Sequence, residues 1–312
     1  MNQHRCNCGG RANGREFDAQ EAFENLAHKY RELSRVVSQY MSEAGLERSV
    51  RAKNAATMAV HVERIVGGNN TPPGAFPECC LVGHRTGAHQ FEWFCTGVLV
   101  HPQLVLTAGH CNVPPPGESA PSINAVALTV DSQDDLSAAE IIQVRRRHTH
   151  PNYVQTSEFN DITVLFLATA STTPLVKIAS AGETNKATET TLVGFGNNDI
   201  NSSMGFGLKR QVSVPITSIR RTPKDNLADS ESLFGFDADL EFVAGGGGRD
   251  SCNGDSGGPA YIVVGGSRKV VGLTSRAAGN AKHPCGEAGI YTRIDANMDF
   301  VGKVAKSHGI KL

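Results

Sequence analysis

The 312-residue chain is long enough for one large domain with an extension, or for two smaller domains. Its 30 basic and 31 acidic residues nearly balance, which argues against a surface for nucleic acid or anionic membrane, and no apolar run reaches the roughly 18 residues of a membrane span. Abundant glycine, 33 residues, with only 20% charged residues favours a turn-rich β protein over a helical bundle.

The first ten residues, MNQHRCNCGG, lack the apolar stretch of a secretory signal peptide. The eight cysteines nevertheless point to an oxidising compartment. Because these observations disagree, three readings stay open: an intracellular protein, export by another route, or a longer precursor. Cys6 and Cys8, with His4, are a weak metal-binding signal, and we interpret the two cysteines as free thiols. We expect neither a metal nor another cofactor.

Residues 16–63 have the pattern of a helical region. Apolar side chains recur there at alternating steps of three and four residues: Phe23, Leu26, Tyr30, Leu33, Val37, Tyr40 and Ala44. Gly45 predicts a break, and Arg51–Val62 predicts a second helix. We interpret residues 1–64 as a helical leader. It is either a hairpin packed on itself or on the rest of the chain, or a module in which residues 16–63 meet a protein partner or a second copy.

The pattern changes from residue 65 onward to short apolar runs separated by Gly, Pro, Asn and Ser. The runs are Gly97–Val100, Leu104–Leu106, Ala125–Val130, Ile162–Leu167, Thr191–Val193, Gln211–Ile216, Tyr261–Val264 and Val270–Leu273. Many short strands at this spacing predict an all-β barrel or sandwich. The residues from Asp295 onward predict a closing helix.

A glycine-rich turn surrounds Ser256 in the run Gly254-Asp255-Ser256-Gly257-Gly258-Pro259. Glycine permits backbone conformations that other residues avoid, so this turn can aim the N–H groups of Gly254 and Ser256 at one point. Two such N–H groups are what a developing oxyanion needs. Ser256 is therefore our candidate nucleophile, with Gly254 and Ser256 as the oxyanion hole.

A serine hydroxyl needs a base to become nucleophilic. His110, in Leu106-Thr107-Ala108-Gly109-His110-Cys111, is the candidate base. An imidazole in this role needs a buried carboxylate that fixes its tautomer and stabilises its charged form. Asp161, which precedes the apolar run Ile162–Leu167, is the candidate carboxylate.

Four segments together resemble the trypsin/chymotrypsin family of serine proteases. They are Ile65-Val66-Gly67-Gly68 and the segments around His110, Asp161 and Ser256, in the family's order. The resemblance covers residues 65–312 and implies two six-stranded antiparallel β-barrels, with the catalytic triad in the cleft between them. It also implies a serine endopeptidase that acts on protein or peptide substrates through an acyl-enzyme.

The resemblance also implies that the protein is made as a zymogen. Family members are cut just before an Ile-Val-Gly-Gly sequence, which here places the cut after Arg64. The new ammonium group of Ile65 would then pair with Asp255, next to the nucleophile. Because a buried charge needs a partner, this ion pair would act as a switch.

Substrate preference is implied by the residue six positions before the nucleophile, which in the family lies at the bottom of the S1 pocket. That residue is Asp250, and it implies cleavage after Arg or Lys through charge-assisted hydrogen bonds. Ser275, Ala277 and Gly289 match other positions of this pocket, although Ala277 replaces a family glycine. Arg276 replaces a family tryptophan, and we expect it to alter the S2–S4 surface and to favour acidic residues upstream of the cut.

Cysteine pairing follows the resemblance as well. The family's disulfide beside the histidine and the one that braces the S1 pocket imply the pairs Cys95–Cys111 and Cys252–Cys285. Cys79 and Cys80 lie on an expected early strand, where we interpret them as small buried residues.

Two alternatives to an Arg/Lys-specific protease stay open. One is a protease with another P1 preference, such as small apolar residues. The other is an inactive homologue that serves as a binding or adaptor protein through its leader. The complete set of His110, Asp161 and Ser256 and the intact Arg64–Ile65 junction argue against the second alternative.

Overall fold

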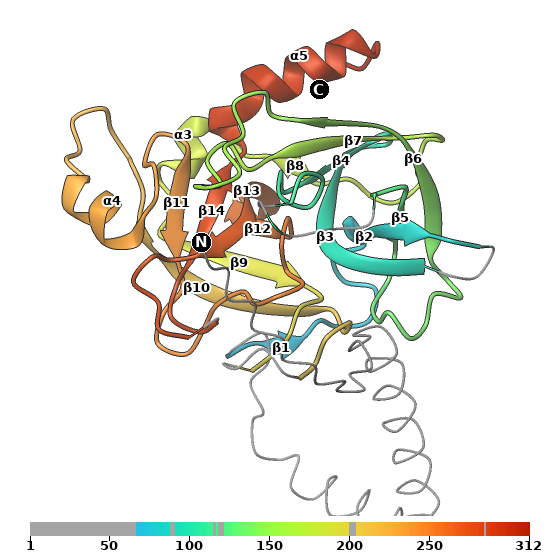
Figure 1. Cartoon of the computed structure of the whole chain (residues 1–312), viewed down its shortest axis with the longest axis horizontal. Coiled ribbons are helices and arrows are strands. Elements are labelled where there is room, and N and C mark those ends of the chain that lie inside the picture. Colours follow the sequence, from blue (N-terminus) through green and yellow to red (C-terminus); the bar gives the residue numbers. More distant parts are fainter. Residues whose placement is uncertain (1–66, 88–90, 115–116, 118–121, 200–203, 284) are drawn as a thin grey trace, which may run out of the picture. The chain divides into compact units, whose positions relative to one another are not determined.

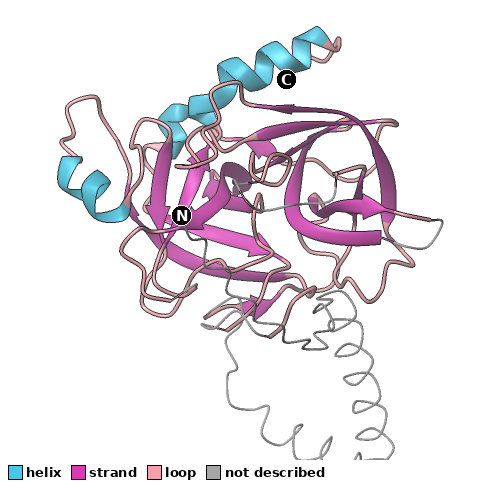
Figure 2. Cartoon of the chain, in the orientation of Figure 1, coloured by secondary structure: helices cyan, strands magenta, loops and turns pink. Residues whose placement is uncertain are grey.

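A computed structural model describes residues 67–87, 91–114, 117, 122–199, 204–283 and 285–312. The predicted helical leader, together with Arg64 and Ile65, lies outside these described residues. Strands dominate the described part, and short helices lie at its periphery (Figure 2). Among the helices that the structure describes, none combines the length and the apolar character needed to cross a membrane.

Six antiparallel strands close into the first barrel, in the order β2-β3-β4-β7-β6-β5. The strands are β2 (Cys79–Arg85), β3 (Phe91–His101), β4 (Leu104–Thr107), β5 (Ala125–Leu128), β6 (Glu140–Thr149) and β7 (Thr163–Leu167). Pairing of β2 with β5 closes the ring. All residues of β4, β5 and β7 are buried, which explains why these strands are continuous apolar runs in the sequence.

The second barrel follows in the chain and lies beside the first (Figure 1). Its strands are β9 (Glu189–Gly194), β10 (Arg210–Ser218), β11 (Glu241–Ala244), β12 (Pro259–Val264), β13 (Ser267–Ala277) and β14 (Gly289–Arg293). The order β10-β11-β14-β13-β12-β9 is closed by pairing of β9 with β10. Two short strands extend this sheet: β1 (Asn69–Asn70) pairs with β10, and β8 (Lys177–Ile178) pairs with β13. The predicted fold of two six-stranded antiparallel barrels is confirmed.

The predicted closing helix is also confirmed, as α5 (Met298–Ser307) after the 3₁₀ turn η1 (Asp295–Asn297). Its Val301 and Ala305, four residues apart, are buried on one face. Two short helices connect strands of the second barrel: α3 (Ala181–Thr184) and α4 (Ala228–Phe234).

One apolar cluster joins the two barrels. It contains Leu81, Leu104 and Phe166 from the first barrel, and Tyr261 and Leu273 from the second. The candidate catalytic residues His110, Asp161 and Ser256 lie in loops next to β4, β7 and β12, so this packed core connects the two barrels that carry them.

Candidate active site

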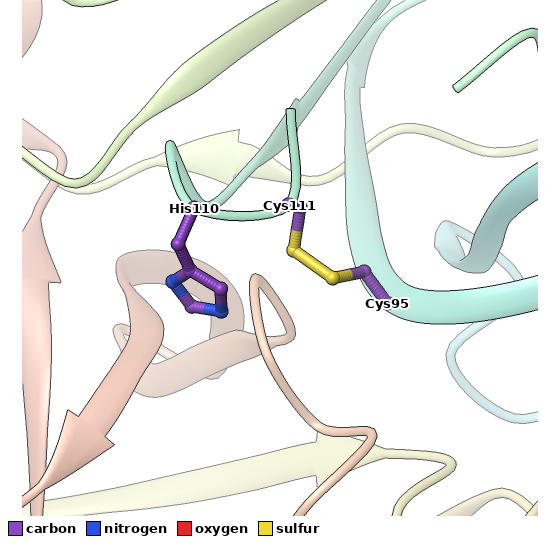
Figure 3. A group of neighbouring side chains, drawn as sticks. All are labelled: Cys95, His110 and Cys111. Carbon is purple, nitrogen blue, oxygen red and sulfur yellow. A yellow bond between two sulfur atoms is a disulfide. The ribbon is translucent and has the colours of Figure 1, made fainter. Parts of the chain in front are cut away.

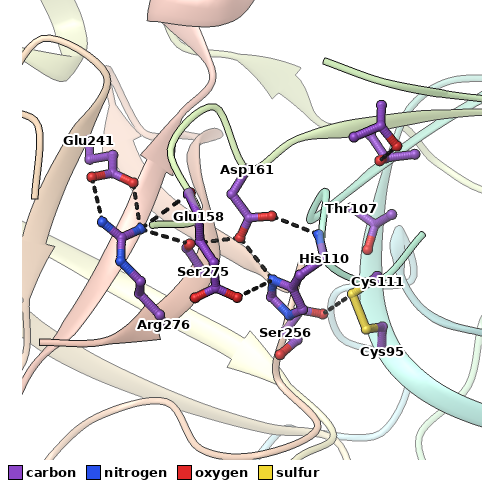
Figure 4. A network of polar contacts seen from close by, with 12 residues as sticks. Cys95, Thr107, His110, Cys111, Glu158, Asp161, Glu241, Ser256, Ser275 and Arg276 are labelled. Atoms are coloured by element: carbon purple, nitrogen blue, oxygen red, sulfur yellow. Dashed lines mark hydrogen bonds and ion pairs between the residues drawn. A yellow bond between two sulfur atoms is a disulfide. The ribbon is translucent and has the colours of Figure 1, made fainter. Parts of the chain in front are cut away.

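His110 and Asp161 come from neighbouring strands of the first barrel. His110 follows β4 and Asp161 precedes β7, and these two strands pair. Asp161 Oδ2 lies 2.9 Å from the ring Nδ1 of His110, and Asp161 Oδ1 accepts the backbone N–H of His110 at 2.8 Å (Figure 4). Because an ionised carboxylate can only accept, Nδ1 carries a proton and Nε2 is the basic nitrogen.

The Asp161 carboxyl is ionised although it is fully buried. Burial by itself raises the pKa of this carboxyl, but the charge of His110 and hydrogen bonds from His110 and Ser275 outweigh burial and lower the pKa below its usual value. The Ser275 hydroxyl donates to Asp161 Oδ2 at 2.7 Å. The site therefore holds a negative charge behind the imidazole at neutral pH.

Ser256 lies on a tight turn before β12. Gly254 has a φ of 98° and Gly257 a φ of 76°, and side chains with a Cβ rarely allow either value. In the part of the chain that the structure describes, the N–H groups of Gly254 and Ser256 donate to no protein acceptor. Both N–H groups are thus available to an oxygen atom from outside the protein.

The Ser256 turn is attached to the first barrel through Thr96 of β3. The Thr96 N–H donates to Ser256 O at 2.8 Å, and the Thr96 hydroxyl donates to Gly254 O at 2.8 Å. Figure 4 shows Ser256 beside the His110 ring, on the side away from Asp161. The structure thus brings the three predicted triad residues together.

Asp255, the predicted partner of Ile65, is buried. Its Oδ1 accepts the N–H of Gly196 at 2.8 Å, and its Oδ2 accepts the N–H of Cys252 at 2.8 Å. Burial nevertheless raises the pKa of this carboxyl to about 6. The two partners expected for activation, Arg64 and Ile65, lie outside the described residues.

A pocket of about 60 Å³ opens next to Ser256. Its lining consists of Asp250, Ser251, Cys252, Asn253, Ser256, Thr274, Ser275, Arg276, Ala277 and Gly289. The four residues predicted for the S1 pocket therefore lie in one pocket with the candidate nucleophile.

Asp250 is the buried acid of this pocket, with a relative exposure of 2%. Its Oδ1 accepts the N–H of Ser251 at 2.7 Å and the hydroxyl of Tyr291 at 3.1 Å. A Cβ at position 289 would lie 2.9 Å from Asp250 Oδ1, so only glycine leaves room there. Burial raises the pKa of Asp250 to about 7, because the described residues supply hydrogen bonds but leave much of the desolvation cost uncompensated.

From the sequence we expected Arg276 to alter the S2–S4 surface and to favour acidic substrate residues. In the structure, however, its charge does not face the solvent. Its side chain, 15% exposed, turns inward and forms two hydrogen bonds with the fully buried carboxylate of Glu241. The expected attraction of acidic substrate residues is therefore not supported, because the guanidinium is already paired. Sequence reasoning missed Glu241, although an acidic residue in the otherwise apolar strand EFVA signals a buried cationic partner.

A second carboxylate lies near the imidazole. Glu158 Oε1 is 3.7 Å from His110 Nδ1, and the Glu158 side chain is 21% exposed. The sequence analysis did not identify this residue, because Glu158 lies in a loop without a motif and reaches His110 only through tertiary folding.

Two disulfides lie at the edges of the site. They join Cys95 to Cys111 and Cys252 to Cys285, the pairs that the family resemblance implies. Figure 3 shows His110 next to the first disulfide, where the two sulfur atoms and the imidazole lie close together. Sulfur atoms in a disulfide are not thiolates, so this group is not a ligand set for a metal while the bond is intact.

Cys79 and Cys80 are fully buried, as predicted, and both are free thiols in the part of the chain that the structure describes. Burial raises the pKa of both thiols well above the usual value. These thiols are therefore inert at neutral pH.

Known proteins resemble the chain over most of its length. Residues 65–301 match the family model described as Trypsin. A protein named Trypsin from Saccharopolyspora erythraea is 30% identical over 216 residues, which cover 67% of this chain and 86% of the relative. Another named Trypsin, from Phaedon cochleariae, is 30% identical over 222 residues, with coverage of 69% and 80%. Trypsin 5G1 from Aedes aegypti is 29% identical over 249 residues, with coverage of 78% and 85%.

Proposed function

The chain belongs to the trypsin family of serine proteases, and from this premise we propose that it is the zymogen of an endopeptidase that cleaves after Arg or Lys. One observation supports the proposal most directly. The hydrogen-bonded His110 and Asp161 lie beside Ser256, and the pocket next to Ser256 contains the buried acid Asp250. In this proposal, residues 1–64 are the leader and residues 65–312 the protease domain.

In the first half of the reaction, Ser256 Oγ attacks the carbonyl carbon of the substrate while His110 Nε2 takes the hydroxyl proton. The carbonyl oxygen becomes negative and accepts hydrogen bonds from the N–H groups of Gly254 and Ser256. The C–N bond then breaks as His110 returns the proton to the leaving amine. An ester between Ser256 and the acyl part of the substrate remains.

In the second half, a water molecule attacks the ester and His110 Nε2 takes its proton. The proton then passes to Ser256 Oγ, and the new carboxylic acid leaves. In both halves the imidazole becomes cationic, and the ionised Asp161 at 2.9 Å stabilises that charge. This stabilisation requires the low pKa of Asp161, since a neutral acid would lend little support.

Asp250 would select the substrate by its charge. The guanidinium or ammonium of a P1 side chain can form a charge-assisted hydrogen bond with the carboxylate in the pocket. The hydrogen-bond donors to the buried Asp250, Ser251 and Tyr291, are both uncharged. A bound P1 side chain would therefore supply the cation that compensates the charge of Asp250.

We expect this selectivity to depend on pH. The pKa of Asp250 is about 7, so the carboxylate is mostly protonated below this value and loses its attraction for a cation. The ratio of kcat/KM for an Arg-ending peptide to kcat/KM for the neutral citrulline-ending peptide should fall about tenfold between pH 8 and pH 6. Protonation of His110 affects both substrates equally and cancels in the ratio. Asp250→Asn is the control, and a ratio that still falls with pH in this variant would assign the effect to another group.

Activation would proceed through Asp255. Cleavage after Arg64 creates the ammonium of Ile65, and a cation beside the buried Asp255 would stabilise its ionised form. Because Asp255 lies between Gly254 and Ser256, its position controls where the two N–H groups point. The raised pKa of Asp255, about 6, supports this proposal, since it marks a buried carboxyl whose charge is not fully compensated.

N-terminal sequencing tests the activation step. After incubation, active wild-type protein is expected to begin at Ile65, while Arg64→Gln is expected to keep its original N terminus and to have no measurable activity. The Ser256→Ala protein distinguishes self-activation from cleavage by a contaminant, because only a contaminant would cut it. An active preparation without an Ile65 terminus would contradict the zymogen proposal.

A further inference from the structure

Behind the proposed triad lies an ion pair that the mechanism above does not use. Arg276 Nη1 lies 2.6 Å from Glu241 Oε1, and Nη2 lies 2.9 Å from Oε2. Glu241 begins β11 and Arg276 lies near the end of β13, and both strands pair with β14. The ion pair therefore links two strands that are not neighbours in the barrel.

Arg276 also reaches the hydroxyl that contacts Asp161. Its Nη1 donates to Ser275 Oγ at 3.2 Å, and Ser275 Oγ donates to Asp161 Oδ2 at 2.7 Å (Figure 4). A serine hydroxyl has one hydrogen, so accepting from Arg276 leaves that hydrogen directed at Asp161. A cationic donor also polarises the hydroxyl and strengthens its bond to the carboxylate.

The loop that carries Asp161 makes further contacts with Arg276. Nη1 lies 3.4 Å from the carbonyl oxygen of Glu158, and the guanidinium lies 5.4 Å from the ring centre of Phe159. Glu158 and Asn160 both have a φ of 55°, a conformation that non-glycine residues adopt only at a cost.

The charge of the pair is balanced. An unpaired arginine near Asp161 would draw electron density from the carboxylate and weaken its support of the His110 cation. The fully buried Glu241, which also accepts the N–H of Asp237 at 2.9 Å, offsets this charge. The pair can therefore orient Ser275 without adding a net charge to the site.

We propose that Arg276 and Glu241 are positioning residues, which direct the Ser275 hydroxyl at Asp161 and so keep His110 aligned with Ser256. The inference rests on the proposed function, because it concerns the efficiency of that triad. Neither residue touches the reacting atoms in this scheme. Because Arg276 also lines the pocket next to Ser256, KM can change as well, and the measurement that identifies positioning is the loss of kcat.

The test replaces the ion pair by apolar residues of similar size, in Arg276→Met/Glu241→Leu. Such replacements of buried ion pairs usually preserve folding, because no unpaired charge is left behind. We expect kcat for an Arg-ending fluorogenic peptide to fall about tenfold or more, as for other small displacements of catalytic groups. Arg276→Gln/Glu241→Gln is a second variant, in which both positions retain polar groups but the side chain at position 276 becomes too short to reach Ser275. It should show the same loss.

A double-mutant cycle with Ser275→Ala separates positioning from general damage. If Arg276 and Glu241 act through Ser275, then removing them in the Ser275→Ala background should cause no further loss of kcat. The control is Arg268→Met/Glu78→Leu, which replaces a 2.9 Å ion pair between the buried Glu78 and the exposed Arg268, outside the hydrogen bonds to Asp161. The control should retain the wild-type kcat.

Three outcomes would overturn the inference: a wild-type kcat in both pair variants, a rise of KM without a loss of kcat, or losses that multiply in the Ser275→Ala background. Failure of the proposed function looks different. In that case, wild-type protein beginning at Ile65 would hydrolyse the peptide no faster than Ser256→Ala.

Discussion

Replacing Ser256 with alanine is expected to lower kcat for an Arg-ending peptide by about a millionfold, the usual cost of losing a triad nucleophile. The alanine side chain has no oxygen to form the acyl-enzyme, and His110 then has no hydroxyl to deprotonate. The fold should be unaffected, because the Ser256 backbone carbonyl, not its hydroxyl, accepts the hydrogen bond from the Thr96 N–H. Turnover after removal of the leader, measured with a fluorogenic peptide, checks this expectation.

A fluorophosphonate probe gives an independent measurement of the same residue. It should label Ser256 in the wild type and fail to label Ser256→Ala, while the exposed-site control Ser267→Ala should behave like the wild type. Undiminished turnover in Ser256→Ala would remove Ser256 from the mechanism. A wild type that binds peptides but neither hydrolyses them nor reacts with the probe would instead favour the inactive binding homologue.

Strands that are buried on both faces were predictable from the sequence. The runs Leu104–Leu106 and Ile162–Leu167 correspond to β4 and β7, in which every residue is buried. β6 was not predicted, because three consecutive exposed arginines, Arg145, Arg146 and Arg147, interrupt its apolar residues. Alternation of buried and exposed residues is a weaker signal when the buried positions are only partly apolar.

The short helices were missed for two different reasons. α4 buries none of its residues, so no apolar stripe marks it in the sequence. α3 has only four residues, but Ser180 and Glu183 form a capping box that does mark its start.

The residues of the candidate site also differ in how far the sequence predicts them. His110, Asp161, Ser256 and Asp250 lie in short motifs, and a motif carries its own local geometry. The pair of Arg276 and Glu241 has no motif, because its members are 35 residues apart and meet only after β11 and β13 have paired with β14. The direction of the Arg276 side chain therefore depended on a partner that local patterns do not reveal.

Replacing Asp250 with serine is expected to lower kcat/KM for Arg-ending peptides by about 10²- to 10³-fold, because one partner of a buried charge pair is lost. Leu-ending and citrulline-ending peptides do not use this charge, so their kcat/KM should change far less. The measurement is the set of three kcat/KM values, before and after the substitution. Asp134→Ser, on the surface, is the control and should retain the wild-type preference.

Equal losses for all three peptides would contradict a role in P1 selection and would indicate damage to the catalytic turn instead. A wild type that prefers the Leu-ending peptide would favour the alternative P1 preference. Labelling by the fluorophosphonate probe distinguishes both outcomes from loss of the nucleophile, because the probe reacts with Ser256 without a P1 cation.

The same substitution should increase stability at neutral pH. The pKa of Asp250 is raised from an ordinary value of 3.8 to about 7, so the buried acid is tolerated while it is protonated and becomes costly once it ionises. Its favourable contribution is fully present below about pH 4 and is lost as the pH rises through about 7. Asp250→Ser, made in the Ser256→Ala background to prevent self-digestion, should therefore unfold at a higher temperature than its parent at pH 8. This difference should vanish near pH 4. A parent that is equally stable or more stable at pH 8 would show that Asp250 already has a buried cationic partner, in which case the pocket would have little need of a substrate Arg or Lys.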